Sequence, residues 1–375
     1  MNTGAWITSL IRAADEDNTV GARRCDQATA AAVLRSAPAE QQGHARLALA
    51  DFAEAGSAPL AMLRSDQVAA GFTPAAGVSV LVARMTVPGG PWPGRFGLEA
   101  LAFTTRPAVM PGWFPAAPES GLHFGEMVAA SRAFRDGAGA VLFPEQLAVA
   151  VRPVSQAFGV VFIGRLSGLF AERVLPVLAP GTFSAAELGA IGQLRELAFL
   201  AHERGHQAAL GFETAAARQR RLAAVIAELH ADLDALVMLA DSGDARAAAV
   251  ARVLVADRIV REAWLRRSHA QVDAIAARQL LVLLARAGAA YLTEDQLLGL
   301  DLDAARQAAV DELSRVREVE RDCVGGLAPA REYLAASGWT VVGTACHREL
   351  AFPLARFLAY VASRRRPPNR LPAAA

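Results

Sequence analysis

The feature that most limits the fold of this chain is a change of pattern at APGTFSAAEL, which begins at residue 179. Before it, short β-branched or aromatic runs alternate with Pro- and Gly-rich breakers, which is typical of strands and turns. After it, nearly every segment to about residue 364 has helical periodicity. Ser184 followed by Glu187 forms a capping box, which predicts that a helix begins there. We therefore expect an α+β protein: a mixed region with a small sheet, then a mainly α-helical domain.

The same pattern predicts three parts. Residues 1–180 form a mixed α/β domain, beginning with short alanine-rich helices to about residue 70, that makes one wall of a cleft. Residues 181–364 form the helical domain, and residues 365–375 form a flexible tail rich in Arg and Pro. Within these parts, a helix is expected around Glu126 to Phe134, and Thr293 with Gln296 predicts another helix start.

The composition excludes several classes of protein. A hydrophobic fraction of 53% with 20% charged residues indicates a globular chain, and a net charge of +1 provides no attraction for nucleic acid or an anionic membrane. No window has eighteen uninterrupted apolar residues, and the N-terminus lacks a secretion signal. The three cysteines are far apart, as in a reducing compartment. We expect a cytoplasmic protein, and the abundant alanine and absent lysine indicate a GC-rich bacterial genome; the oligomeric state stays open.

One motif carries specific chemistry. His202 and His206 are four residues apart, and Glu203 follows the first of them. On a helix this spacing directs both imidazoles to the same side, where they could bind a divalent metal, with a carboxylate nearby to accept a proton. The surrounding helix is apolar, so two buried histidines need a reason to be there. Gly205 costs the helix about 1 kcal/mol relative to alanine, which is understandable if something approaches its backbone closely.

A third metal ligand is expected on the next helix, in LAAVIAELHADLDALVML. Its apolar residues define a core face, and four polar residues lie at the borders of that face. They are Glu228 and Asp232 at one border, and His230 and Asp234 at the other. Helical phase allows a single metal ion to use one pair or the other, and it does not choose between them.

The motif and its spacing resemble the gluzincin metallopeptidases, in which HExxH is followed by a glutamate about twenty residues later. The stretch AELHADLDAL is similar to the corresponding helix of the dipeptidyl peptidase III-like metallopeptidases. The resemblance implies a zincin-like helical domain in which His202, His206 and Glu228 bind the metal. It also implies that Glu203 is the base and that Asp232 supports a ligand histidine. The chain has two residues between Glu203 and His206, where that peptidase family usually has three.

The residues and the resemblance together predict a zinc-dependent hydrolase that acts on a peptide or related amide. Such a reaction also needs a donor for the developing oxyanion. His269 and Tyr291 are the predicted donors, and Arg261, Arg266 and Arg278 lie in the same region. Two alternatives stay open: an oxygenase with Fe²⁺ in place of Zn²⁺, because two histidines and a carboxylate also suit non-haem iron, and a non-catalytic protein with a structural metal.

Overall fold

The structure is a computed structural model, and it describes part of the chain. The described residues are 42–43, 46, 77–86, 96–106, 109–114, 122–130, 140–144, 156–208, 221–265, 272–323, 326–342, 345–350 and 352–363. They fall into two compact units: one contains the five strands β1 to β5, and the other contains the elements that follow Arg165. The expected helices before residue 70 and the tail from residue 365 lie almost wholly outside the described residues.

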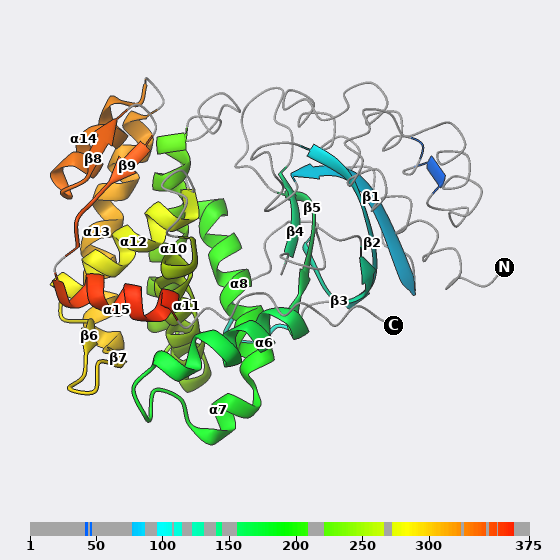
Figure 1. The fold of residues 1–375 in the computed structure, drawn as a ribbon, viewed down its shortest axis with the longest axis horizontal. Coiled ribbons are helices and arrows are strands. Elements are labelled where there is room, and N and C mark those ends of the chain that lie inside the picture. The colour runs from blue at the N-terminus through cyan, green and yellow to red at the C-terminus, as the bar shows by residue number, and fades with distance from the viewer. Residues whose placement is uncertain are drawn as a thin grey trace. The chain divides into compact units, whose positions relative to one another are not determined.

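The first unit contains a five-stranded sheet of order β1-β2-β3-β5-β4 (Figure 1). Its strands are β1 Val78–Thr86, β2 Phe96–Arg106, β3 Leu122–Ala130, β4 Ala140–Pro144 and β5 Gln156–Phe162. Neighbours are antiparallel except β3 and β5, which are parallel. The small sheet expected from the sequence is therefore confirmed. The helix expected from Glu126 is wrong, because Glu126 lies in β3 and pairs with Thr104 of β2.

The second unit is mainly helical, as expected. Its helices are α6 Ile163–Arg173, η3 Leu175–Val177, α7 Ala185–Gly189, α8 Ile191–Ala208, α10 Arg221–Asp241, α11 Ala245–Leu265, α12 Val272–Arg286, α13 Leu302–Asp322, α14 Ala328–Ala336 and α15 Phe352–Ser363. Two short hairpins join them: β6 Ala290–Leu292 with β7 Leu298–Leu300, and β8 Thr340–Val342 with β9 Ala345–His347. Among the described residues, no helix is long and apolar enough to cross a membrane.

Helix α10 lies at the centre of the helical unit and packs against α8, α11, α12 and α13 (Figure 1). The core face expected from its sequence is fully buried: Leu222, Val225, Leu229, Leu233 and Leu236 each have 0% exposure. Because α10 has neighbours on several sides, polar side chains at the borders of this face also lie inside the unit. Such side chains must find partners there.

Two local expectations have different outcomes. The capping box at Ser184 is present: its side chain accepts from the Glu187 backbone N–H, and the Glu187 carboxylate accepts from the Ser184 backbone N–H. The helix start predicted at Thr293 is wrong, because Thr293 closes the turn between β6 and β7. The backbone N–H of Thr293 donates to Leu297, and Gln296 has a left-handed φ of 60°. The Ser/Thr-x-x-Glu/Gln pattern also suits such a turn, in which the Thr293 hydroxyl accepts from the Leu297 N–H.

Candidate metal centre

Helices α8 and α10 approach each other closely at Gly205. A Cβ atom added to this residue would lie 2.4 Å from the carbonyl oxygen of Ala231 and 2.6 Å from its Cα. Real Cβ atoms do not tolerate such distances, so only glycine fits. The close backbone approach expected from the sequence is therefore present, and the neighbour is α10. The contact brings the HExxH segment of α8 against the segment of α10 that carries Glu228 and Asp232.

Three side chains from the two helices form a compact group of possible metal ligands: His202, His206 and Glu228. The His202 Nε2 and His206 Nε2 atoms are 3.1 Å apart. Glu228 Oε2 lies 3.3 Å from His202 Nε2, and Glu228 Oε1 lies 3.5 Å from His206 Nε2. Ligands of a tetrahedral zinc ion, with bonds of about 2.0–2.1 Å, are about 3.3–3.4 Å from one another. The spacing and the chemistry of these donors therefore fit a zinc ion.

Asp232 forms a hydrogen bond with His202. Its Oδ1 atom lies 2.9 Å from His202 Nδ1, on the side of the ring away from the ligand nitrogen. Burial raises the pKa of Asp232, but the charge of Arg258 and the bond to His202 outweigh burial and lower it. Asp232 is therefore ionised at neutral pH. A carboxylate in this position fixes the tautomer and orientation of a ligand histidine.

The two borders of α10 have different partners, as helical phase predicted. Glu228 and Asp232 face α8, where they contact His202, and α11, where they contact Arg258. On the other border, His230 forms a short, fully buried pair with Glu320 of α13. Asp234 pairs with Arg317 of the same helix at 2.8 Å. The alternative ligands are thus engaged with α13, and Glu228 is the residue that joins the two histidines.

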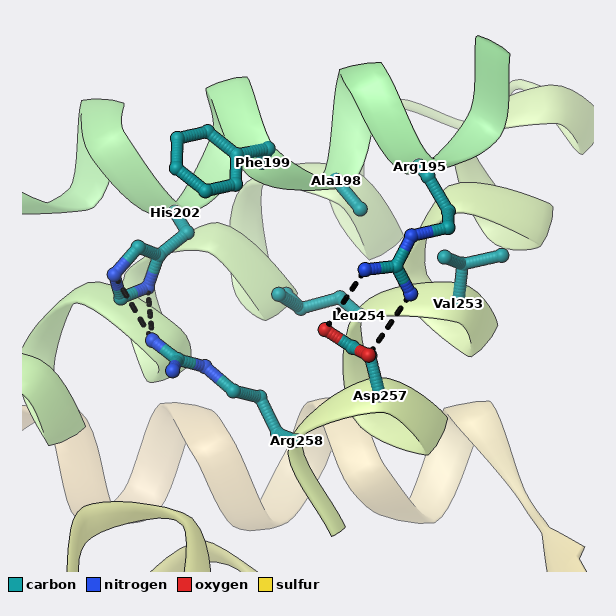
Figure 2. Close-up of a pocket in the computed structure, with 8 residues that line it drawn as sticks. All are labelled: Arg195, Ala198, Phe199, His202, Val253, Leu254, Asp257 and Arg258. Atoms are coloured by element: carbon teal, nitrogen blue, oxygen red, sulfur yellow. Dashed lines mark hydrogen bonds and ion pairs between the residues drawn. The ribbon is translucent and has the colours of Figure 1, made fainter. Parts of the chain in front are cut away.

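Arg258 of α11 contacts His202, Glu228 and Asp232. The sequence did not predict this residue as part of the site. Its Nε donates to Asp232 Oδ1 at 2.6 Å, and its Nη2 lies 3.3 Å from Glu228 Oε2. The same Nη2 is 2.8 Å and 2.9 Å from the two ring nitrogens of His202 (Figure 2). Arg258 is 3% exposed. A signal was available, because Asp257 and Arg258 interrupt an apolar helical run and buried charges require partners.

The charges around His202 determine its protonation when no metal is bound. Burial and the charge of Arg258 lower the pKa of this histidine. The hydrogen bonds to Asp232 and Glu228 and the charge of Asp232 outweigh them, and the pKa rises from 6.5 to about 9. Burial raises the pKa of Glu228, but the charge of His206 and hydrogen bonds with both histidines hold it well below its usual range. A metal ion must therefore displace a proton from His202 to bind there.

A small cavity of about 30 Å³ adjoins the group between α8 and α11. It is large enough for a water molecule. Figure 2 shows His202 and Arg258 on one side of it, and the ion pair between Arg195 and Asp257 on the other. That pair is two-pronged, with nitrogen–oxygen distances of 2.8 Å and 3.4 Å. Helix α8, which carries the two histidines, is thus joined to α11 by an arginine–aspartate ion pair that is separate from the group.

Three other residues were predicted to take part in catalysis: Glu203, Tyr291 and His269. Glu203 follows His202 on α8 and is 8% exposed. Tyr291 lies on β6, covers Gly299 of β7, and lines a separate pocket between α12, β6 and α15. None of the three possible ligands lines that pocket. His269 lies outside the described residues. The structure therefore brings together His202, His206, Glu228 and Asp232, and the roles of the others stay predictions.

Comparisons with known proteins show where this fold occurs. No protein-family model and no curated protein matches the sequence. Among solved structures, DPP III from Caldithrix abyssi is similar with a TM-score of 0.58 and 11% identity, over 90% of this chain and 67% of that one. Dipeptidyl-peptidase III from Corallococcus sp. strain EGB is similar with a TM-score of 0.59 and 14% identity, over 90% of this chain and 66% of that one.

The chain thus spans about two thirds of the length of these enzymes. It has a fold similar to dipeptidyl peptidase III, with a His-His-Glu group that is consistent with an HExxH-type metal site.

Proposed function

We propose that this chain is a zinc-dependent hydrolase that cleaves a peptide or related amide bond. The observation that carries the proposal is the group formed by His202, His206 and Glu228, whose donor atoms have the spacing of zinc ligands. A fold similar to enzymes named dipeptidyl peptidase III supports peptides as the substrate class. Neutral imidazoles and one carboxylate leave a fourth position open, as catalytic rather than structural zinc sites do.

The proposed reaction gives each residue a separate task. A zinc ion held by the three ligands would supply an electrophile and make water acidic near neutral pH. The Glu203 carboxylate would then accept a proton from the attacking water and pass it to the leaving amine. Asp232 would keep His202 in the tautomer that presents Nε2 to the metal. His269 or Tyr291 would stabilise the oxyanion. Because Tyr291 lines a different pocket, His269 is the first of the two to substitute.

The proposal is tested by measuring zinc content first and peptide cleavage second. Protein purified without chelators should contain one zinc per chain by elemental analysis and native mass spectrometry. It should cleave members of a peptide library in which the N-terminal residues are varied. Glu203→Gln should keep the zinc and lose at least about 10²-fold in kcat, because the amide can hold water but cannot accept its proton.

Two results would contradict the proposal. Stoichiometric iron without zinc would favour the oxygenase alternative, in which Glu203 has no role as a base. Turnover of a verified peptide at the wild-type rate by Glu203→Gln would exclude the hydrolytic mechanism. His269→Ala should lower kcat without changing the zinc content, which separates a role in turnover from a role in metal binding.

A further inference from the structure

Arg258 places a positive charge among the atoms that would bind the metal. Its Nη2 lies 2.9 Å from His202 Nε2 and 3.3 Å from Glu228 Oε2. These are two of the donor atoms that the three-residue group offers to a cation. An ion bonded to these two atoms would lie beside the guanidinium and its positive charge. Arg258 and a metal ion therefore bring positive charge to the same two atoms.

The charges of the group lead to the same conclusion. With both histidines neutral, as metal ligands must be, the carboxylates of Glu228 and Asp232 already balance the charge of a divalent ion. The guanidinium of Arg258 adds a positive charge beside that ion. Repulsion between buried like charges is weakly screened. Arg258 should therefore oppose binding of the ion.

Asp232 is not paired with Arg258 in the way that best neutralises a carboxylate. Its Oδ1 accepts from Arg258 Nε and also contacts His202, while Oδ2 is buried and has no hydrogen-bond partner within the described part of the chain. An arginine whose only task was to neutralise this carboxylate would bind both oxygens. Arg195 of α8 does so with Asp257 of α11. The Arg258 guanidinium is instead turned toward the metal ligands.

We propose that Arg258 is an internal competitor for the metal ion. Its guanidinium lies beside the donor atoms of His202 and Glu228, and its charge repels a cation that binds to them. When a divalent ion binds, Nη2 leaves these atoms while Nε stays on Asp232, and the unpaired Oδ2 gives the guanidinium a second acceptor to turn to. Arg258 thereby sets the metal affinity of the site. This inference rests on the proposed function, because it requires that the group binds a metal.

The experiment measures zinc affinity by competition with a chromophoric chelator, on the 375-residue chain freed of metal. Arg258→Gln should bind zinc at least about 10-fold more tightly than wild type. Arg195→Gln removes a neighbouring buried arginine that does not contact the ligands, and it should leave zinc affinity unchanged. Thermal unfolding gives a second readout: without metal, Arg258→Gln should melt lower than wild type, and zinc should raise its melting temperature by more.

Arg258→Lys covers the case in which the Gln variant does not fold. A single ammonium group can neutralise Asp232 but cannot also place a second nitrogen among the ligands. This variant should therefore bind zinc more tightly than wild type, by a smaller factor. Stoichiometric zinc in wild type with no gain in either Arg258 variant would overturn the inference and leave the proposed function standing. Absence of zinc binding in wild type and in every variant would overturn both.

Discussion

Gly205 of α8 lies against the backbone of Ala231 of α10 so closely that a Cβ atom would be 2.4 Å from the Ala231 carbonyl oxygen. The obstacle is backbone rather than a flexible side chain, so a larger residue would have to push the two helices apart. The metal ligands are divided between these helices: His202 and His206 lie on one, and Glu228 on the other. The distance between the helices thus controls the distance between the ligands.

Gly205→Ala should therefore lose both stability and metal. Overpacking of this kind costs about 1–3 kcal/mol in unfolding free energy, although alanine is the better helix former. The separation of the helices should also weaken zinc binding. Gly168→Ala is the matched control, because Gly168 lies within α6 with nothing within 4 Å of its Cβ position. This variant should be neutral or gain up to about 1 kcal/mol. Denaturant unfolding and zinc titration of both variants test the relationship.

The sequence predicted which polar side chains of α8 and α10 lie together. A spacing of four residues was enough to place His202 and His206 together, and helical phase was enough to group Glu228 with Asp232 and separate them from His230 and Asp234. These predictions hold because they depend on the geometry of a single helix. The role of Gly205 also followed from its cost within a helix, although the sequence did not identify Ala231 as its neighbour.

What the sequence missed depends on contacts between distant segments. Arg258 lies 26 residues beyond Asp232 in the chain, on a third helix, and no local pattern relates its side chain to His202. The turn at Thr293 was mistaken for a helix start because the same hydroxyl can accept an N–H in a hairpin as well as at a helix end. Glu126 was assigned to a helix although its backbone pairs with β2. Pairing between strands is decided by partners outside the segment.

The choice of Glu228 as the third ligand gives a test that needs no substrate. Glu228→Ala should be purified without stoichiometric metal, because it removes a charged donor from the group. His230→Ala should keep a full complement of metal, since this residue pairs with Glu320 on the opposite side of α10. It should still lose stability, because removing one member of a buried pair leaves a carboxylate without its partner. Loss of metal in His230→Ala with retention in Glu228→Ala would reverse the ligand assignment.

The metal-free protein should become less stable as the pH rises above neutrality. The pKa of His202 is raised in the folded state, from 6.5 to about 9. A raised pKa gives stabilisation that is fully present below about pH 6.5 and is lost as the pH rises through about 9. The expected loss in unfolding free energy is on the order of 3 kcal/mol. Urea unfolding in the presence of a chelator, at intervals from pH 6 to 9.5, measures it. His202→Gln should show a flatter profile, and a flat profile in wild type would contradict the assignment.

Asp232 provides the last test, because a single oxygen of its carboxylate contacts both His202 and Arg258. Asp232→Asn keeps the size of the side chain and removes its charge. The metal ligand His202 loses its orienting carboxylate, so zinc should bind about 10- to 100-fold more weakly. Asp257→Asn is the control, because Asp257 pairs with Arg195. It should reduce stability without changing zinc affinity.

The double variant Asp232→Asn with Arg258→Gln separates the two contacts of Asp232. If Arg258 competes with the metal, removing it should restore part of the affinity that Asp232→Asn loses, since the buried positive charge is then gone as well. The remaining deficit measures what Asp232 contributes by orienting His202. Side chains in contact show such coupling, with interaction energies of about 0.5–3 kcal/mol. Zinc titrations of the wild type, both single variants and the double variant complete the cycle. An affinity of the double variant no higher than that of Asp232→Asn alone would show that Arg258 does not oppose the metal.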